Sequence, residues 1–210
     1  MRFSRRLIWL SFSVIIFLLI LAPVTTKAVD SGPTVQLKAS VDTLLKVLRD
    51  ESLKGAENSD IRRERIAEVV FMQFDMRRMA KLSLGRGWRK LSEAEREHFI
   101  GLFRKLLSKS YIATIDGYSG EKISYVKEII KGNKAEVRTM VIGNAKEIAL
   151  TYKLKLDDSR WLIYDVIIEN VSLVRNYRSQ FDPIMKKEGF TGLVKRMEER
   201  IAVSGAKKDG

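Results

Sequence analysis

The segment WLIYDVII, residues 161–168, constrains the fold more than any other part of this chain. Read as a strand, it carries apolar side chains on both faces, with Trp161, Ile163 and Ile167 on one face and Leu162, Tyr164, Val166 and Ile168 on the other. A strand of this kind needs cover on both sides, whereas a half-exposed strand alternates apolar and polar residues. The pattern indicates an apolar interior, one side of which could cover a ligand.

The sequence from about residue 122 onward has the period of two that is typical of strands. Turn signals follow at Gly132-Asn133, at Gly143-Asn144 and at residues 157–159, where hairpins need them. Apolar residues alternate with charged ones between these turns, at Ala135, Val137, Thr139, Val141, Ile148, Leu150, Tyr152, Leu154 and Leu156. We predict an antiparallel four-stranded meander over residues 122–131, 134–142, 146–156 and 160–168.

The sequence before the meander has helical periodicity and helix start signals. A leucine-rich stripe over residues 37–48 predicts a first helix, and Ser59 or Asp60 can cap a second helix that ends near residue 71. Asp75 can cap a short third helix that stops at Gly85. Ser92 and Glu95 form a capping box before the longest apolar stripe of the chain, which contains Phe99, Leu102, Phe103, Leu106, Leu107 and Tyr111.

Helix returns at Ser172 after the meander. Asp182 followed by Pro183 is typical of a helix start, so we expect the chain to change direction there. Gly189 should end this short helix, and Thr191 can begin a last one. Helices, then a sheet, then helices predict an α+β fold in which the helices cover one face of the sheet.

The N-terminal residues are typical of a secretory signal peptide, with Arg5 and Arg6 before an apolar run at residues 7–22 and small residues before a cut after Ala28. Retention of this segment as an anchor is the alternative. We expect one domain over residues 29–203 and a flexible basic tail at 204–210.

The chain is strongly basic, with a formal net charge of +13, of which about +9 remains without the signal peptide. Such a charge attracts polyanions, but export argues against nucleic acid as the partner. The absence of cysteine excludes disulfides, thiolate chemistry and cysteine metal sites.

Few residues suggest catalysis. The single histidine, His98, lies on a charged helix flank without convergent partners, so we expect it on the surface and predict no metal or cofactor. Asp157 and Asp158 suit a turn better than a carboxylate pair. Asp165 is either the polar partner of a nearby backbone or arginine, or a general base assisted by Tyr152 in an enzyme.

The number of apolar residues that compete for one interior is unusual, since the helices add a Met- and Phe-rich segment at residues 71–79. Methionine suits adaptable pockets because its side chain is unbranched. A lipid with two acyl chains could fill the interior, at ~0.8 kcal/mol for each methylene removed from water. A packed interior, as in an adaptor that binds only protein, is the alternative.

Three segments carry a family resemblance: FDMRRMAKLSLGRGWRKLSEAEREHFIGLFRKLL from residue 74, WLIYDVIIENVSLVRNYRSQF from residue 161, and EGFTGLV from residue 188. Their order and the specific L-G-R-x-W-R block resemble the MlaC family, also called toluene-tolerance auxiliary proteins. The resemblance implies a cone-shaped α+β fold similar to nuclear transport factor 2, without enzymatic activity. It also implies a monomeric periplasmic phospholipid carrier of a Gram-negative bacterium.

Such a carrier would shuttle lipid between an outer-membrane lipoprotein–porin complex and an inner-membrane ABC transporter with an MCE-domain subunit, maintaining outer-membrane asymmetry. Some relatives are linked to hopanoids, which leaves another apolar lipid as the alternative cargo. From strand and helix facing, we expect the lipid to contact Phe74, Met79, Leu106, Tyr111, Val141, Tyr152, Val166, Ile168 and Tyr177. Arg86, Arg175 and Arg178 are candidates for head-group or partner contacts.

Overall fold

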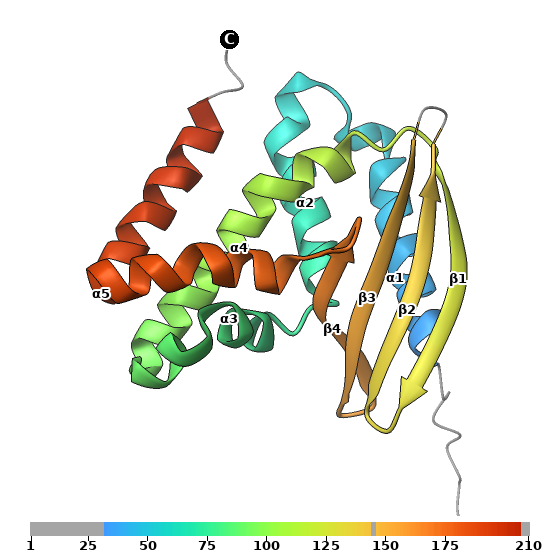
Figure 1. The fold of residues 1–210 in the computed structure, drawn as a ribbon. Helices are drawn as coiled ribbons and strands as arrows, with labels where there is room; N and C mark the ends of the chain where they lie inside the picture. Colours follow the sequence, from blue (N-terminus) through green and yellow to red (C-terminus); the bar gives the residue numbers. More distant parts are fainter. Residues whose placement is uncertain (1–31, 144–145, 207–210) are drawn as a thin grey trace, which may run out of the picture. The chain divides into compact units, whose positions relative to one another are not determined.

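A five-stranded antiparallel sheet forms one layer of the protein (Figure 1). The computed structural model describes residues 32–143 and 146–206, so the predicted signal peptide and the end of the predicted tail lie outside the described residues. The strands follow in sequence order as β1 (Lys122–Lys131), β2 (Lys134–Ile142), β3 (Glu147–Asp157), β4 (Arg160–Ile168) and β5 (Val171–Ser172). The α+β class and the meander are confirmed, with a fifth, two-residue strand that we did not predict.

A bulge in β4 changes which residues share a face. Ile163 lies opposite Leu154 and Asp165 lies opposite Lys153, so Tyr164 is an extra residue in the ladder. The extra residue brings Ile163 and Val166 to the same face, although strict alternation would separate them. Our assignment of β4 faces was therefore wrong beyond Tyr164.

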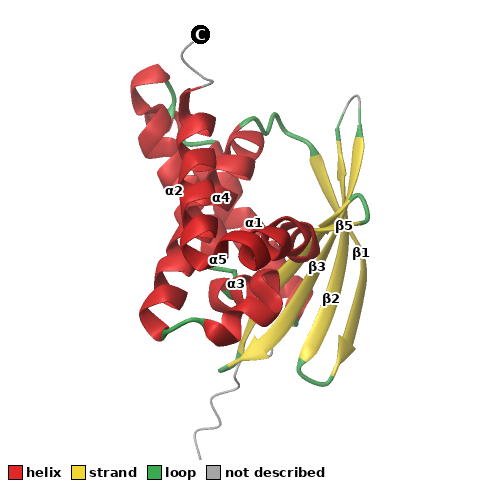
Figure 2. Ribbon diagram, turned by 60° about the vertical axis from the view of Figure 1, so that its left-hand side comes forward, coloured by secondary structure: helices red, strands yellow, loops and turns green. Residues whose placement is uncertain are grey.

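The α-helices lie on one side of the sheet, and the other face is uncovered in the described part of the chain (Figure 2). They are α1 (Pro33–Leu48), α2 (Ser59–Phe71), α3 (Met76–Leu84), α4 (Glu93–Asp116) and α5 (Leu173–Ala206), with short 3₁₀ turns η1 (Glu51–Leu53), η2 (Ala56–Asn58) and η3 (Gly85–Lys90). Of the helices described, none has both the length and the apolar character to cross a membrane.

Helix α1 is tied to the inner face of the sheet by polar contacts at its first turn. The backbone N–H of Thr34 donates to a carboxylate oxygen of Glu128 on β1 over 2.8 Å. The backbone N–H of Trp161 on β4 donates to Gln36 Oε1 over 2.6 Å. Helix α1 is therefore held at opposite sides of the sheet and leaves space beneath its leucine stripe.

Two of the predicted caps form as expected. Asp75 accepts from the backbone N–H of Arg78 over 2.8 Å, and Ser92 and Glu95 form the reciprocal capping box of α4. Helix α2 differs, because its N-cap is Asn58 and no side chain caps it. The 3₁₀ turn η2 runs directly into α2 and occupies the position that a capping residue would need.

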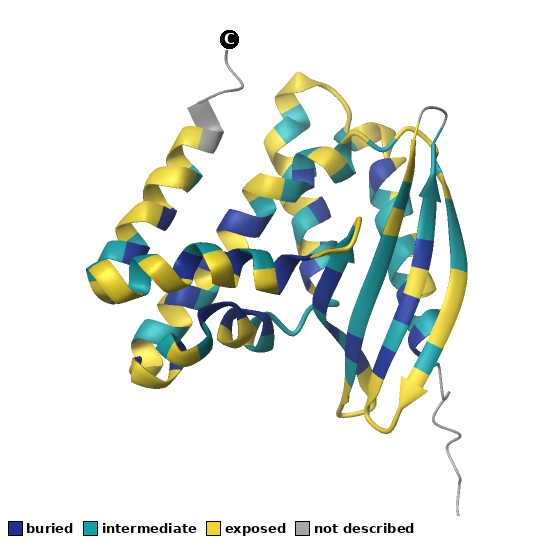
Figure 3. Cartoon of the chain, in the orientation of Figure 1, coloured by how far each residue is buried: buried dark blue, intermediate teal, exposed yellow. Residues whose placement is uncertain are grey.

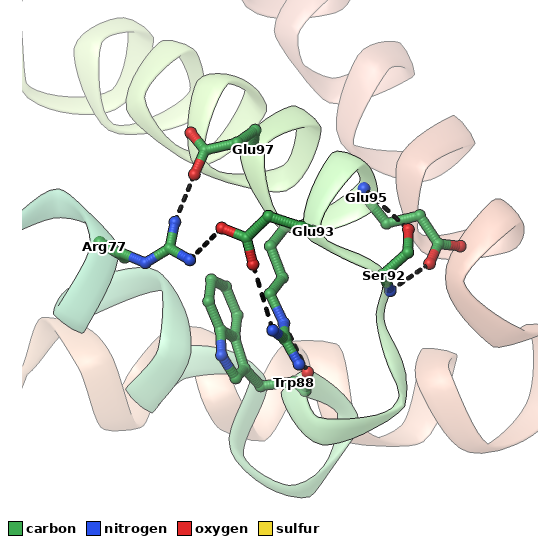
Figure 4. Close-up of polar contacts among 7 residues, drawn as sticks. Arg77, Trp88, Ser92, Glu93, Glu95 and Glu97 are labelled. Carbon is green, nitrogen blue, oxygen red and sulfur yellow. Dashed lines mark hydrogen bonds and ion pairs between the residues drawn. The ribbon is translucent and has the colours of Figure 1, made fainter.

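The start of α4 is joined to α3 through charged side chains around Trp88 (Figure 4). Arg77 forms ion pairs with Glu93 and Glu97, and Arg96 also binds Glu93. The guanidinium carbons of Arg77 and Arg96 lie 5.8 and 5.5 Å from the centroid of the buried indole ring. This network positions η3 against α4.

Helix α5 continues through Asp182 and Pro183, so the change of direction that we predicted there does not occur. The aromatic rings of Tyr177 and Phe181 are packed against Phe103 and hold the preceding turns in helical geometry. The kink lies instead at Gly189, with φ 69° and ψ −166°, which only glycine adopts readily.

Figure 3 shows buried residues on both the helices and the sheet. One cluster of buried apolar residues lies among the helices and one lies mainly on the sheet, and a small third cluster joins Leu48, Ile66 and Ile112. Phe99, Phe103, Tyr177 and Phe181 pack in the helical cluster. The sheet cluster includes Val137, Leu154 and Ile163, and the half-buried Phe74 and Tyr111 touch both clusters. The space between these two clusters is where a cavity can form.

Candidate functional site: an apolar cavity between sheet and helices

A cavity of about 680 Å³ lies between the inner face of the sheet and helices α1, α2 and α4. Its volume is within the range of small-molecule binding sites. The strands contribute their inward residues, as the alternation in β2 and β3 predicts, and the β4 bulge adds Ile163 together with Val166. The wall is largely aliphatic and aromatic, so it favours hydrocarbon over polar ligands.

Most of the residues that we expected around a ligand lie in this wall. They come from the segment after α2, from α3, from α4 and from strands β2 to β4: Phe74, Met79, Tyr111, Val141, Tyr152, Val166 and Ile168. The β4 bulge places Ile168 on the same face as Ile163.

The structure places Leu106 and Tyr177 in the helical core, with 1% and 2% of their surfaces exposed. Neither is among the described residues that line the cavity. The ring of Tyr177 packs edge-on against Phe103 at a centroid distance of 5.2 Å, and its hydroxyl lies 3.3 Å from Ser110 Oγ. These contacts hold Tyr177 in the packing between α4 and α5, and Leu106 is buried in the same helical cluster.

Sequence reasoning missed two parts of the wall. Helix α1 contributes its leucine stripe, the last turns of α4 contribute Ile112 and Ile115, and the loop after α4 contributes Tyr118. Leu44 and Leu45 remain partly exposed because the stripe faces the cavity. The stripe was visible in the sequence, but periodicity shows which residues share a face and not what that face meets.

Tyr152 presents a polar group within this wall. Burial raises the pKa of Tyr152 to about 12, the nearby Tyr125 adds to the rise, and the Thr139 hydroxyl opposes it. The phenol is therefore neutral at physiological pH.

Asp165 lies on the sheet face that is turned away from the cavity. It is paired with Lys153, and Lys153 points to the opposite face from its neighbour Tyr152, which lines the cavity. Its carboxylate accepts from Ser172 Oγ over 2.7 Å and from the backbone N–H of Val174 over 3.2 Å. The carboxylate therefore caps the start of α5. An enzyme that pairs Asp165 with Tyr152 would need both on one face, which the register does not provide.

Arg86, Arg175 and Arg178 are exposed and are not among the described residues of the cavity wall. The pKa of Asp182 is lowered by a hydrogen bond from Lys186 and by the nearby Arg178 and Arg86. Arg178 also lies against η3, because a Cβ on Gly85 would meet its Nε at 2.8 Å. Arg86 and Arg178 therefore lie where η3 meets α5.

Metal-binding side chains do not cluster in the described part of the chain, where no group of three or more His, Asp or Glu residues converges. His98 is exposed on α4, as expected for a surface histidine.

The fold and the cavity define a class of α+β proteins in which a meander sheet and one helical layer enclose an apolar ligand site. Within this class, residues 38–199 match the family described as MlaC protein, and the chain belongs to that family.

The chain is similar to two characterised proteins over most of its length. It is 22% identical over 195 residues to the intermembrane phospholipid transport system binding protein MlaC of Haemophilus influenzae, covering 90% of this chain and 91% of that protein. A phospholipid-binding protein from Ralstonia solanacearum, solved in complex with a phospholipid at 1.53 Å resolution, shares the fold with a TM-score of 0.72. The match has 23% identity and covers 81% of this chain and 97% of that one.

Proposed function

We propose that this protein is a non-enzymatic phospholipid carrier that buries acyl chains in the cavity between the sheet and the helices. The observation that carries the proposal is the cavity itself, whose aliphatic and aromatic wall has few polar groups. Each buried methylene contributes ~0.8 kcal/mol, so the chains supply most of the affinity. In this proposal Phe74, Met79, Tyr111, Val141, Tyr152, Val166 and Ile168 contact the chains.

The relatives support the choice of cargo. The Haemophilus influenzae relative is named for intermembrane phospholipid transport, and the Ralstonia solanacearum relative was solved with a phospholipid. Shared family membership and the equivalent fold make a phospholipid the best-supported cargo of this chain.

The working cycle that we propose follows from the family. The chain is exported by a cleaved signal peptide to the periplasm and acts there as a monomer with one lipid-binding domain. It exchanges lipid between an outer-membrane lipoprotein–porin complex and an inner-membrane ABC transporter with an MCE-domain subunit, which maintains outer-membrane lipid asymmetry.

Native mass spectrometry of gently purified protein, with extraction and identification of bound lipid, tests the cargo. The matched variants are Leu150→Trp, which fills the cavity, and Thr151→Trp, which adds the same ring on the outer face of β3. We expect phospholipid on the unaltered protein and on Thr151→Trp, and a several-fold lower occupancy on Leu150→Trp.

Protein without bound lipid that also takes up none from phospholipid vesicles would contradict the proposal. Recovery of a hopanoid or another apolar lipid in place of phospholipid would support the alternative cargo. Equal occupancy of the two variants would show that lipid is held elsewhere.

A further inference from the structure

No described helix covers the outer face of the sheet (Figure 2). The strand register places a concentration of basic side chains on this face. The inward residues of β2 and β3 are buried or line the cavity, so the intervening residues point outward. We call the outward basic residues of β1, β2 and β3 the basic sheet face: Lys122, Lys127, Lys131, Lys134, Arg138, Lys153 and Lys155.

The strand register places like charges directly opposite one another on this face. Lys131 lies opposite Lys134, and Lys134 lies opposite Lys155, which makes a row of three lysines across three strands. Lys127 lies opposite Arg138 in a second like-charge pair. Like charges in directly opposed cross-strand positions destabilise a sheet, so folding alone does not favour this arrangement.

The acids on the outer face are fewer than its basic residues: Glu136 lies opposite Lys153, and Glu147 and Asp157 lie at the two ends of β3. Glu136 accepts from Arg138 Nε over 2.7 Å, and Asp165 is buried in its bonds with Ser172 and Val174. Asp158 lies in the turn that follows β3. The lysines that form ion pairs among the described residues are Lys54 and Lys186, and neither belongs to the basic sheet face.

We infer that the basic sheet face is a docking surface for an acidic protein partner. Charge complementarity selects an anionic surface, and the position of the cavity selects a protein over a bilayer. A bilayer against this face would be separated from the cavity by the whole sheet. An acidic protein can hold the carrier by its outer face and leave the lipid side free. The inference goes beyond lipid binding, and only its choice of a protein over a bilayer rests on the proposed function.

The test compares two triple variants with the same change in net charge. Lys131→Glu, Lys134→Glu and Lys155→Glu reverse the lysine row, while Lys81→Glu, Lys105→Glu and Lys109→Glu reverse exposed lysines of α3 and α4. The probe is a fluorescent polyglutamate peptide, whose binding is measured by anisotropy at low and at physiological salt. Phosphatidylglycerol vesicles in a sedimentation assay are the second probe.

We expect the row variant to bind the peptide about tenfold more weakly and the α3/α4 variant to stay within about twofold of the unaltered protein. Equal losses in both variants would overturn the inference, because net charge alone would then explain binding. A row variant that loses only vesicle binding would also overturn it, in favour of a membrane partner.

Folding and cargo are measured on the same samples. If the row variant does not melt cooperatively, Lys131→Gln, Lys134→Gln and Lys155→Gln remove the charges without adding acids, and the same expectation holds. Bound phospholipid is quantified in each sample by mass spectrometry. Absence of lipid from every sample would contradict the proposed function and leave the docking result intact.

Discussion

At the scale of single residues, Asp165 shows how a buried carboxylate can serve structure instead of chemistry. Its partners are the hydroxyl of Ser172 and the N–H of Val174, at the point where the sheet ends and α5 begins. An anion at this position also interacts favourably with the positive end of the helix dipole. The residue fixes the direction in which α5 leaves the sheet.

Replacing Asp165 with alanine should lower the free energy of unfolding by about 2 kcal/mol, because Ser172 and Val174 would lose their acceptor in a buried site. Urea unfolding measures the loss. Asp165→Asn should cost less, because its carbonyl oxygen can still accept from Val174. Bound lipid should be unchanged in both variants, and a loss of lipid binding with unchanged stability would contradict this assignment.

The raised pKa of Tyr152 predicts a dependence of stability on pH in the alkaline range. The phenol ionises near pH 10 in the unfolded chain but near 12 in the folded protein, so the folded state holds its proton more tightly. The stability from this group is complete below pH 10 and is lost as the pH rises toward 12. Unfolding at pH 9 and 11 should show a larger loss for the unaltered protein than for Tyr152→Phe.

The sequence leaves two roles open for Asp165, because a buried acid in a strand can act either as a general base or as a structural hydrogen-bond partner. The choice depended on Tyr164, because an unpredicted bulge decides which face Asp165 occupies. Local patterns contain no signal for that extra residue. The positions of Arg86 and Arg178 beside Asp182 likewise depend on long-range packing.

At the scale of secondary structure elements, the kink at Gly189 sets where the last part of α5 packs. That part contributes the buried residues Leu193 and Met197 to the helical core. The kink therefore turns a long helix back onto α4.

Gly189→Ala should destabilise the protein by roughly 1–3 kcal/mol, because its φ of 69° and ψ of −166° strain any side chain. Gly101→Ala is the matched control, since Gly101 is exposed inside α4 and a Cβ there would meet nothing within 4 Å. The control should stabilise by about 0.5–1 kcal/mol. Thermal unfolding followed by circular dichroism measures both, and a neutral Gly189→Ala would contradict the assignment of the kink.

Elements with strong local signals were predictable. The meander has its turns at Gly132 and at Asp158, and the capping box starts α4 at Ser92, as the sequence indicates. Pro183 misled the prediction because its local preference for a helix start was overridden by the packing of Tyr177 and Phe181. Tertiary contacts decide such cases, and single-sequence patterns do not contain them.

At the scale of the whole molecule, the cavity separates two packed regions, and a bound lipid would join them. The walls from the sheet and from the helices meet mainly through Phe74 and Tyr111, so the empty protein leaves apolar surface uncovered. Cargo and stability should therefore be linked.

Removal of bound lipid should lower the melting temperature by roughly 5–10 °C, since a ligand at a hundred times its Kd adds about 2.7 kcal/mol. Differential scanning calorimetry before and after delipidation measures the shift, and added phospholipid should restore it. Leu150→Trp should show a much smaller shift. An unchanged melting temperature in the unaltered protein would contradict the link.

Both edges of the sheet are protected against pairing with a strand of another molecule. On the β4 side, the backbone N–H of Ile163 donates to the Gln73 carbonyl and the Ile163 carbonyl accepts from the Asp75 N–H, each over 2.8 Å. β5 pairs with the end of the same edge, at Ile167 and Ile168. β1 is the remaining rim in the described chain, and its bulge at Val126 and its lysines at 122, 127 and 131 disrupt a flat template. Copies of the protein should therefore resist strand-to-strand aggregation and remain dispersed at high concentration.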